Sequence, residues 1–108
     1  MRIISGIFKG SNLFTIKDKS TRPLKDLVRE SIFNLLTHSN IINFKIAGSN
    51  ILDLYSGTGS FGLECLSREA KSVFFVENNK TTFDILKKNI DKLDVIHKSK
   101  TFFYDVFY

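Results

Sequence analysis

The chain has 108 residues, of which 43% are hydrophobic and 25% charged, which is typical of one small folded domain rather than a disordered chain. No stretch approaches the roughly 18 to 20 uninterrupted apolar residues of a membrane-spanning helix, and the first residues lack a signal peptide's apolar region. We therefore expect no membrane association and a cytoplasmic location. Because Cys65 is the only cysteine, a fold stapled by internal disulfides is excluded.

The net charge of +5 arises from the first part of the chain. Residues 1–45 carry eight basic and three acidic side chains, whereas residues 46–108 carry eight of each. A basic segment of this kind is typical of a surface that faces nucleic acid. A charged surface that only keeps the protein soluble is the alternative interpretation of the same excess.

Residues 1–45 predict a β-hairpin followed by a helix. The β-branched stretch 2–8 and the apolar stretch 13–16 flank turn residues at 9–12. Pro23 suits the start of a helix, which we expect to end near His38. Helical spacing places Arg29 on the polar side of this helix. The apolar face predicted from the same spacing comprises Leu27, Val28, Ile32, Leu35 and Leu36.

Residues 46–108 alternate short apolar runs with amphipathic stretches. The run 51–54 predicts a strand buried on both faces, followed by a helix from about Ser60, a strand over 72–77 and a helix over 82–93. Residues 94–97 and 102–105 compete for a third strand. This order predicts an α/β fold, a partial Rossmann-like sheet of about three parallel strands with crossover helices, preceded by the hairpin and helix.

The turn after the first strand of this sheet carries the chemistry. Residues 53–62 read DLYSGTGSFG, and Gly57 and Gly59 allow a sharp bend and the close approach of a ligand. The helix that follows points unpaired N–H groups at the same place. Glu77 ends the next strand, 20 residues after Gly57, where a carboxylate accepts hydrogen bonds from the hydroxyls of a ribose. The alternative is a tight turn beside a solvated Glu77.

Asp53 discriminates between nucleoside cofactors. A carboxylate at this strand end repels the diphosphate of a dinucleotide but pairs with a cation, such as the ammonium group of S-adenosylmethionine. The residues therefore favour S-adenosylmethionine as the cofactor. A nucleotide-dependent oxidoreductase is the competing hypothesis, and binding of a nicotinamide dinucleotide would support it.

Several motifs, in order, resemble a known family. Residues 53–59 (DLYSGTG) resemble motif I of class I S-adenosylmethionine-dependent methyltransferases. Other stretches resemble the RsmD family, the bacterial small-subunit ribosomal RNA guanine-N2 methyltransferases: 2–10 (RIISGIFKG), 21–23 (TRP), 28–34 (VRESIFN), 62–68 (GLECLSR) and 73–77 (VFFVE). The resemblance extends from residue 2 to about residue 90.

The resemblance implies a donor site and an RNA-facing segment. The expected cofactor-binding residues are Asp53, Ser56, Gly57, Thr58, Gly59, Glu77 and Asp105, with Asp105 on the adenine amino group. In residues 1–45, the expected contacts to phosphates of small-subunit ribosomal RNA, alone or in an assembling particle, are Arg2, Lys9, Arg22 and Arg29. Residues 46–108 are expected to form the N-terminal half of the S-adenosylmethionine-binding domain.

The chain departs from the family in one respect. The family's catalytic motif, Asn/Asp-Pro-Pro-Tyr/Phe, holds the exocyclic amine of a flipped base. That motif is absent here because Pro23 is the only proline. We therefore expect a truncated enzyme with no catalytic residue and no turnover alone. The alternative is a non-catalytic RNA- or S-adenosylmethionine-binding fragment that requires a separately encoded C-terminal half.

The sequence predicts neither a metal site nor a thiol nucleophile. Cys65 falls among the apolar residues of a predicted helix, which indicates a buried, inert thiol. His38 and His97 have no cysteine or second histidine at metal-ligand spacing.

Overall fold

The computed structural model describes residues 1–16, 22–38 and 45–105, and for residues 22–27 it describes the backbone only. The elements are helices α1 (Arg22–His38), α2 (Ser60–Ser67) and α3 (Lys80–Lys92), strands β1 (Asn50–Asp53), β2 (Ser72–Glu77) and β3 (Ser99–Phe103), and a 3₁₀ turn η1 (Ile96–Lys98). The third strand thus overlaps the later of its two predicted positions. No helix in these ranges is long and apolar enough to cross a membrane.

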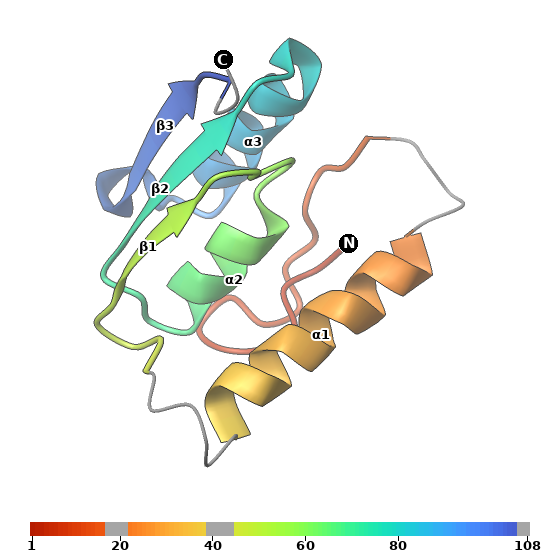
Figure 1. The fold of residues 1–108 in the computed structure, drawn as a ribbon, viewed down its shortest axis with the longest axis vertical. Coiled ribbons are helices and arrows are strands. Elements are labelled where there is room, and N and C mark those ends of the chain that lie inside the picture. Colours follow the sequence, from red (N-terminus) through yellow and green to blue (C-terminus); the bar gives the residue numbers. More distant parts are fainter. Residues whose placement is uncertain (17–21, 39–44, 106–108) are drawn as a thin grey trace.

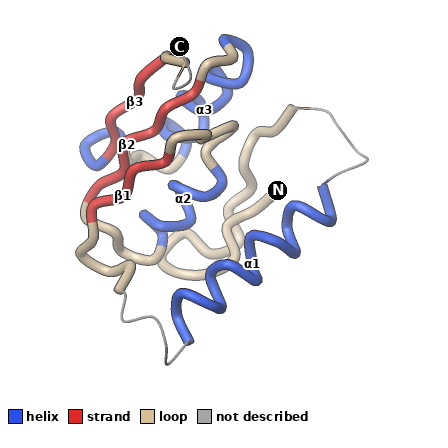
Figure 2. The backbone as a smooth tube through the Cα atoms, viewed as in Figure 1, coloured by secondary structure: helices blue, strands red, loops and turns tan. Residues whose placement is uncertain are grey.

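The strands form one parallel sheet in the order β1-β2-β3. Helices α2 and α3 cover one face of this sheet, and α1 lies outside α2, farther from the sheet (Figure 1; Figure 2). Parallel neighbours need a connection that crosses the sheet face, and α2 and α3 provide it. The predicted α/β fold with three parallel strands and crossover helices is confirmed.

Apolar side chains fill the space between the sheet and the two helices that cover it. Val73 and Phe75 of β2 are fully buried in one core cluster with Leu63 of α2 and Leu86 of α3. A Cβ atom at Gly62 would come within 2.3 Å of the Phe75 ring. Glycine at this position therefore lets α2 lie close against β2, which places the start of α2 beside the end of β1.

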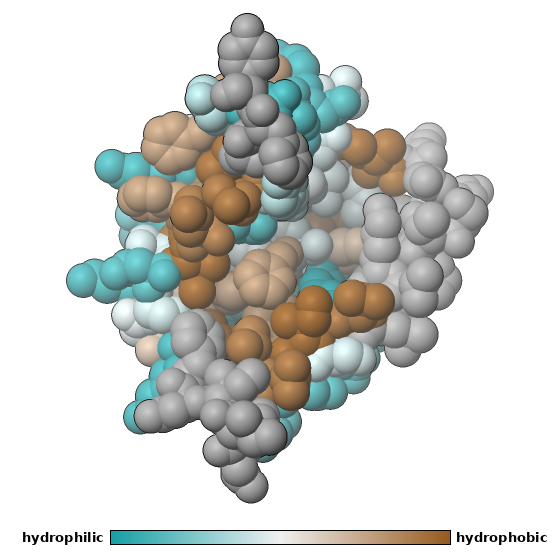
Figure 3. All heavy atoms as spheres, viewed as in Figure 1, coloured by the Kyte–Doolittle hydropathy of each residue, from teal (hydrophilic) through white to brown (hydrophobic). Residues whose placement is uncertain are grey.

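The other face of the sheet carries an apolar strip, made of Leu52, Phe74 and Phe102. All three side chains are exposed, Leu52 to 62%. Leu52 pairs with Phe74 across the first two strands, and the Phe74 and Phe102 rings are 6.1 Å apart. Figure 3 shows apolar side chains gathered along the sheet on the left of the view. The prediction that residues 51–54 are buried on both faces is wrong, because β1 is an edge strand and no described residue covers this face.

Residues 1–16, which we call the arm, differ from the predicted hairpin. Pairing is limited to one antiparallel bridge between Arg2 and Asn12, and residues 5–10 form a bend and a turn rather than a strand. The physical reason is a competing partner, because the chain passes over the end of α2 and bonds to it there. Gly6 has a φ of +89°, and a Cβ atom there would lie 2.0 Å from the Ser67 carbonyl oxygen.

Helix α1 buries a face that shares only the half-buried Leu36 with the predicted one, and the side chain of Leu27 lies outside the described part of the structure. Val28, Ile32 and Leu35 are exposed, whereas Phe33 is fully buried and Arg29 is 6% exposed. The Phe33 ring stacks on Phe61 of α2 at 5.1 Å between ring centroids. Residues at helical spacing form two neighbouring stripes on α1, one with Val28, Ile32 and Leu35 and one with Arg29 and Phe33. The stripe that contains Phe33 packs against α2. The prediction that Arg29 lies on the solvent side is therefore wrong.

Candidate cofactor-binding site

The carboxyl edge of the sheet brings three predicted acidic residues to one end of the fold. Strand β1 ends at Asp53, β2 ends at Glu77, and Asp105 follows β3 by two residues. The backbone N–H of Tyr104 donates to the Glu77 carbonyl oxygen at 3.0 Å, which holds the chain after β3 against the end of β2. In open parallel sheets this edge is where ligands bind.

Ser56 holds the turn between β1 and α2, which we call the glycine turn (residues 54–59). Its Oγ donates to the Asp53 carbonyl oxygen at 2.8 Å and accepts from the Val76 N–H at 3.0 Å. Its own N–H donates to the Val76 carbonyl oxygen at 3.0 Å. The buried hydroxyl proton of Ser56 is thus committed to the backbone, so Ser56 positions the turn between the ends of β1 and β2.

Glu77 closes the glycine turn from the second strand. Its Oε1 accepts from the Gly57 N–H at 3.0 Å, and its Oε2 accepts from the Asn79 N–H at 2.9 Å. Each carboxylate oxygen can accept a second hydrogen bond, so the side chain is oriented by the backbone and still able to receive hydroxyl donors. Glu77, at the end of β2, therefore lies directly beside the glycine turn.

Two glycines give the turn its shape. Gly57 has a φ of +57° and Gly59 a φ of +98°, a region that other residues rarely adopt. A Cβ atom at Gly59 would lie 2.7 Å from Leu86, whereas one at Gly57 would meet nothing within 4 Å. The turn therefore packs against α3 at Gly59 and is open at Gly57, where a ligand can approach the backbone.

Asp53 is partly buried, and its Oδ2 atom has no hydrogen-bond partner among the described residues. Burial raises the pKa of the carboxyl group from 3.8 to about 6, the nearby Glu77 adds to the rise, and the N–H groups of Tyr55 and Gly62 oppose it. A buried carboxylate oxygen without a donor is costly, and a cationic group placed against it removes that cost. The Asp53 carboxylate therefore fits the ammonium group of S-adenosylmethionine.

A hollow of about 330 Å³ lies at the same edge, beyond the ends of β2 and β3. Asn78, Phe103, Tyr104 and Asp105 line it. Phe103 and Tyr104 are more than half exposed, so flat apolar surface borders the carboxylate of Asp105 there. An aromatic wall next to a hydrogen-bond acceptor suits a purine ring with an amino group.

A second hollow, of about 420 Å³, lies between the arm and α1, and we call it the basic hollow. Three of the four predicted RNA contacts line it, namely Arg2, Lys9 and Arg29. Arg2 and Lys9 are exposed, whereas Arg29 is buried and its Nη2 donates to the Arg2 carbonyl oxygen at 2.7 Å. Arg29 thus supports the arm instead of reaching into solvent. The side chain of Arg22 lies outside the described part of the structure.

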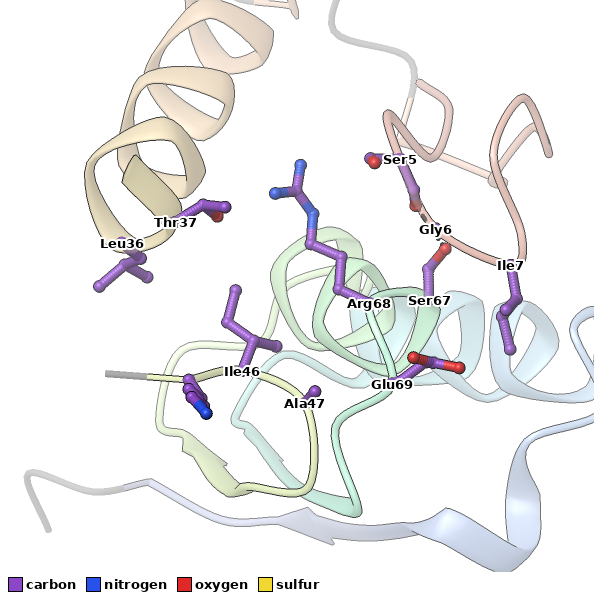
Figure 4. A pocket seen from close by; sticks show the side chains of 11 residues that line it. Ser5, Gly6, Ile7, Leu36, Thr37, Ile46, Ala47, Ser67, Arg68 and Glu69 are labelled. Atoms are coloured by element: carbon purple, nitrogen blue, oxygen red, sulfur yellow. Dashed lines mark hydrogen bonds between the residues drawn. The ribbon is translucent and has the colours of Figure 1, made fainter. Parts of the chain in front are cut away.

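A larger hollow of about 610 Å³ lies between the arm, the end of α1 and residues 45–47 (Figure 4). The Arg68 side chain extends into it, and its Nε donates to Glu64 Oε2 at 2.9 Å. The Arg68 guanidinium also lies 4.3 Å from the Phe33 ring centroid. None of the residues predicted to bind cofactor or RNA lines this hollow.

Glu64 and Asn89, two of the buried polar residues that attach the arm to the helices, escape the sequence-based prediction. Glu64 of α2 accepts from the Ile4 and Ser5 N–H groups at 2.8 and 3.1 Å. Asn89 of α3 bonds to the Phe14 backbone in the arm. Both are fully buried, and each interrupts an otherwise apolar helix face, which is the signal that could have identified them.

The predicted burial of the Cys65 thiol is confirmed. Cys65 is 1% exposed, and burial raises its pKa to about 12, so the thiolate that would act as a nucleophile does not form near neutral pH. Within residues 1–16, 28–38 and 45–105, no cluster of three histidine, cysteine, aspartate or glutamate side chains could hold a metal ion.

Comparison with known proteins places this geometry in a family. The family described as "Conserved hypothetical protein 95" matches residues 1–107. The "Ribosomal RNA small subunit methyltransferase D" of Haemophilus influenzae is 41% identical over 93 residues, which are 86% of this chain and 45% of that protein. The protein of the same name from Buchnera aphidicola subsp. Baizongia pistaciae is 38% identical over 95 residues, 88% of this chain and 46% of that protein.

Solved structures agree with the sequence relatives. The Escherichia coli structure described as "Putative methyltransferase yhhF" superposes with a TM-score of 0.77 at 28% identity. The match covers 97% of this chain and 52% of that one. The chain thus spans about half the length of the relatives that it matches, in sequence and in structure.

Proposed function

The chain belongs to the family described as Conserved hypothetical protein 95, as an RsmD-like N-terminal portion, and on that premise we propose that it forms the donor-binding half of a ribosomal RNA methyltransferase. Residues 46–108 bind S-adenosylmethionine, and residues 1–45 face the RNA. The observation that carries the proposal is the buried Oδ2 of Asp53, which has no donor among the described residues. A ligand with a cationic hydrogen-bond donor, bound next to the open glycine turn, would satisfy this oxygen.

Each predicted cofactor residue has a distinct role in this proposal. Asp53 receives the ammonium group, Glu77 receives the ribose hydroxyls, and the open side of the turn at Gly57 and Thr58 faces the methionine part. Ser56 and Gly59 act through the turn, because the first is hydrogen-bonded to the backbone and the second packs against Leu86. Asp105, in its hollow beside Tyr104, receives the adenine amino group.

The RNA-facing role of the arm rests on charge and shape. Arg2 and Lys9 are exposed cations on the rim of one hollow, which suits a phosphodiester of small-subunit ribosomal RNA. Arg29 contributes by holding the Arg2 backbone, and Arg22 is proposed from its position in the basic segment alone. We further propose guanine N2 as the methylated atom and the cytoplasm as the place of action, both on the resemblance to RsmD.

The chemistry divides between this chain and residues beyond these 108. S-adenosylmethionine bound here would supply an electrophilic methyl group. Its S–C bond would be replaced by a bond to the amine nitrogen, so that the sulfonium would become a thioether and the amine would lose a proton. Asp53 and Glu77 orient the donor, and orientation accounts for much of the acceleration in such transfers. The residues that hold the amine come from elsewhere, because Pro23 is the only proline and a Pro-Pro motif is absent.

The exposed apolar strip favours a second polypeptide segment that covers this face of the sheet. Leu52, Phe74 and Phe102 are exposed together, and the matched relatives extend over about twice this length. Exposed apolar area of this kind marks a surface that another segment covers. We propose a C-terminal half of the methyltransferase sheet as that segment, on the same or a separate polypeptide.

Calorimetric titration of the chain tests the donor site. We expect S-adenosylhomocysteine to bind and a nicotinamide dinucleotide not to bind. Asp53→Ala should weaken binding of S-adenosylhomocysteine roughly 10- to 100-fold, because a charge-assisted hydrogen bond is lost. Asp91→Ala removes an exposed carboxylate from α3 and should leave the affinity unchanged.

Three results would contradict the proposal or one of its parts. Binding of the dinucleotide in place of S-adenosylhomocysteine would favour the oxidoreductase hypothesis. Unchanged affinity in Asp53→Ala would remove the observation on which the donor site depends. Methylation of small-subunit particles by this chain alone would contradict the assignment of the amine-holding residues to another segment.

A further inference from the structure

Asn89 of α3 joins the arm to the glycine turn. Its Oδ1 accepts from the Phe14 N–H at 2.7 Å, and its Nδ2 donates to the Phe14 carbonyl oxygen at 2.9 Å. The same Nδ2 donates to the Thr58 carbonyl oxygen at 2.8 Å. Thr58 lies between the two glycines of the turn, so one side chain bonds to both segments.

The chemistry of this contact is specific to asparagine. The amide pairs with both backbone groups of Phe14, as a neighbouring strand would, and uses its remaining N–H on Thr58. Asn89 is fully buried, so water does not replace these bonds when the side chain is changed. Aspartate keeps one acceptor but loses both donors, and leucine leaves three backbone groups unpaired.

Other contacts carry the connection from Phe14 to the basic hollow. The Lys92 ammonium group lies 5.0 Å from the Phe14 ring centroid and donates to the Asn12 carbonyl oxygen. Asn12 forms the antiparallel bridge with Arg2. The Arg2 carbonyl oxygen then accepts from Arg29 at the wall of the basic hollow. A continuous set of contacts, made of hydrogen bonds, one cation–ring contact and one β-bridge, therefore runs from the glycine turn to the surface proposed to meet RNA.

We propose that Asn89 is a positioning residue that couples donor binding at the glycine turn to the placement of the arm. The inference rests on the proposed function, in which the turn holds the donor and the arm meets RNA. A ligand that orders Thr58 also orders Phe14 through the shared amide, and by linkage an RNA that orders the arm strengthens donor binding by the same factor. Donor and acceptor thereby favour each other's binding.

The first test needs no ligand and uses amide hydrogen exchange of the 108-residue chain, followed by NMR. We expect Asn89→Asp and Asn89→Leu to accelerate amide exchange at Gly59 and at Ile3 and Leu13 of the arm. The acceleration should be at least about tenfold beyond that expected from the loss of global stability. Ile90→Ala is the matched control, because it removes buried apolar atoms from the next position of α3 and leaves the amide in place. Unchanged exchange at Gly59 in both Asn89 variants would overturn the inference.

The second test adds S-adenosylhomocysteine. In the wild type we expect slower exchange at Gly57 and Gly59 and, in parallel, at Ile3 and Leu13. In the Asn89 variants the slowing should remain at the turn and disappear from the arm, while Ile90→Ala should behave as the wild type. Slowing of the arm in the Asn89 variants, or no slowing of the arm in the wild type, would refute the coupling. If S-adenosylhomocysteine does not slow exchange at the turn itself, that result counts against the proposed donor site. The exchange measured without ligand would then still decide whether Asn89 links the two segments.

Discussion

Replacing Asp53 with asparagine separates the stability of the fold from affinity for the donor. Burial raises the pKa of Asp53 from 3.8 to about 6, so folding at neutral pH places a charge where it is poorly solvated. The rise of roughly two pH units corresponds to about 3 kcal/mol of lost stability. Asparagine has nearly the same shape without the charge. We therefore expect Asp53→Asn to raise the free energy of unfolding at pH 8 by up to about 3 kcal/mol.

The gain depends on pH in a definite direction. Near and below pH 3.8 the carboxyl group is protonated in both the folded and the unfolded wild type, so the two proteins should have similar stability. Between pH 3.8 and about 6, the unfolded chain has largely released the Asp53 proton while the folded protein still holds it. The wild type therefore loses stability relative to the variant across this window and remains at a constant disadvantage above it.

Urea denaturation followed by circular dichroism from about pH 4 to pH 8 measures this difference. Asp91→Asn, at an exposed position of α3, is the control and should show no such window. The same Asp53→Asn variant should lose most of its affinity for S-adenosylhomocysteine. A variant that is less stable than the wild type at pH 8, or that is more stable by the same amount at every pH, would refute the reasoning about the buried charge.

Three further predictions concern the site and the arm. Affinity for S-adenosylhomocysteine should fall about tenfold per pH unit below pH 6, because Asp53 must release its proton to meet the ammonium group, and titration at constant ionic strength measures this. Gly62→Ala should lower the free energy of unfolding by about 1–3 kcal/mol, measured in urea, because its Cβ would lie 2.3 Å from the Phe75 ring; an unchanged midpoint would show that α2 can move away. Arg2→Ala and Lys9→Ala should each weaken binding to a small-subunit ribosomal RNA transcript and lower the magnitude of the slope of log affinity against log salt by about 1. Lys71→Ala, at another exposed position, is the control, and an equal effect of this variant would indicate unspecific attraction.

The sequence predicted the sheet better than the segments that precede it. The glycine turn, the strand ending at Glu77 and the helix from Ser60 agree with the structure because their signals are local: glycine spacing, a buried apolar run and the spacing of acidic residues. The arm is different, since its backbone partners lie about 60 residues away in α2, and no local pattern records that Ile4 and Ser5 bond to Glu64. Helix α1 is intermediate, because periodicity predicted the helix correctly but packing against α2 buries Phe33 and Arg29 instead of Val28, Ile32 and Leu35.

The residues alone determined that an open glycine turn and two strand-end carboxylates would meet at one edge of a parallel sheet, because strand order and side-chain spacing follow from the chain itself. Only the tertiary structure decided that Asp53 keeps a buried oxygen without a donor, that Arg29 turns inward, and that Asn89 joins the arm to the turn. Those outcomes depend on burial and on hydrogen bonds between segments distant in sequence. Burial and long-range partners are properties of the packed chain, and they give the same side chains their different roles.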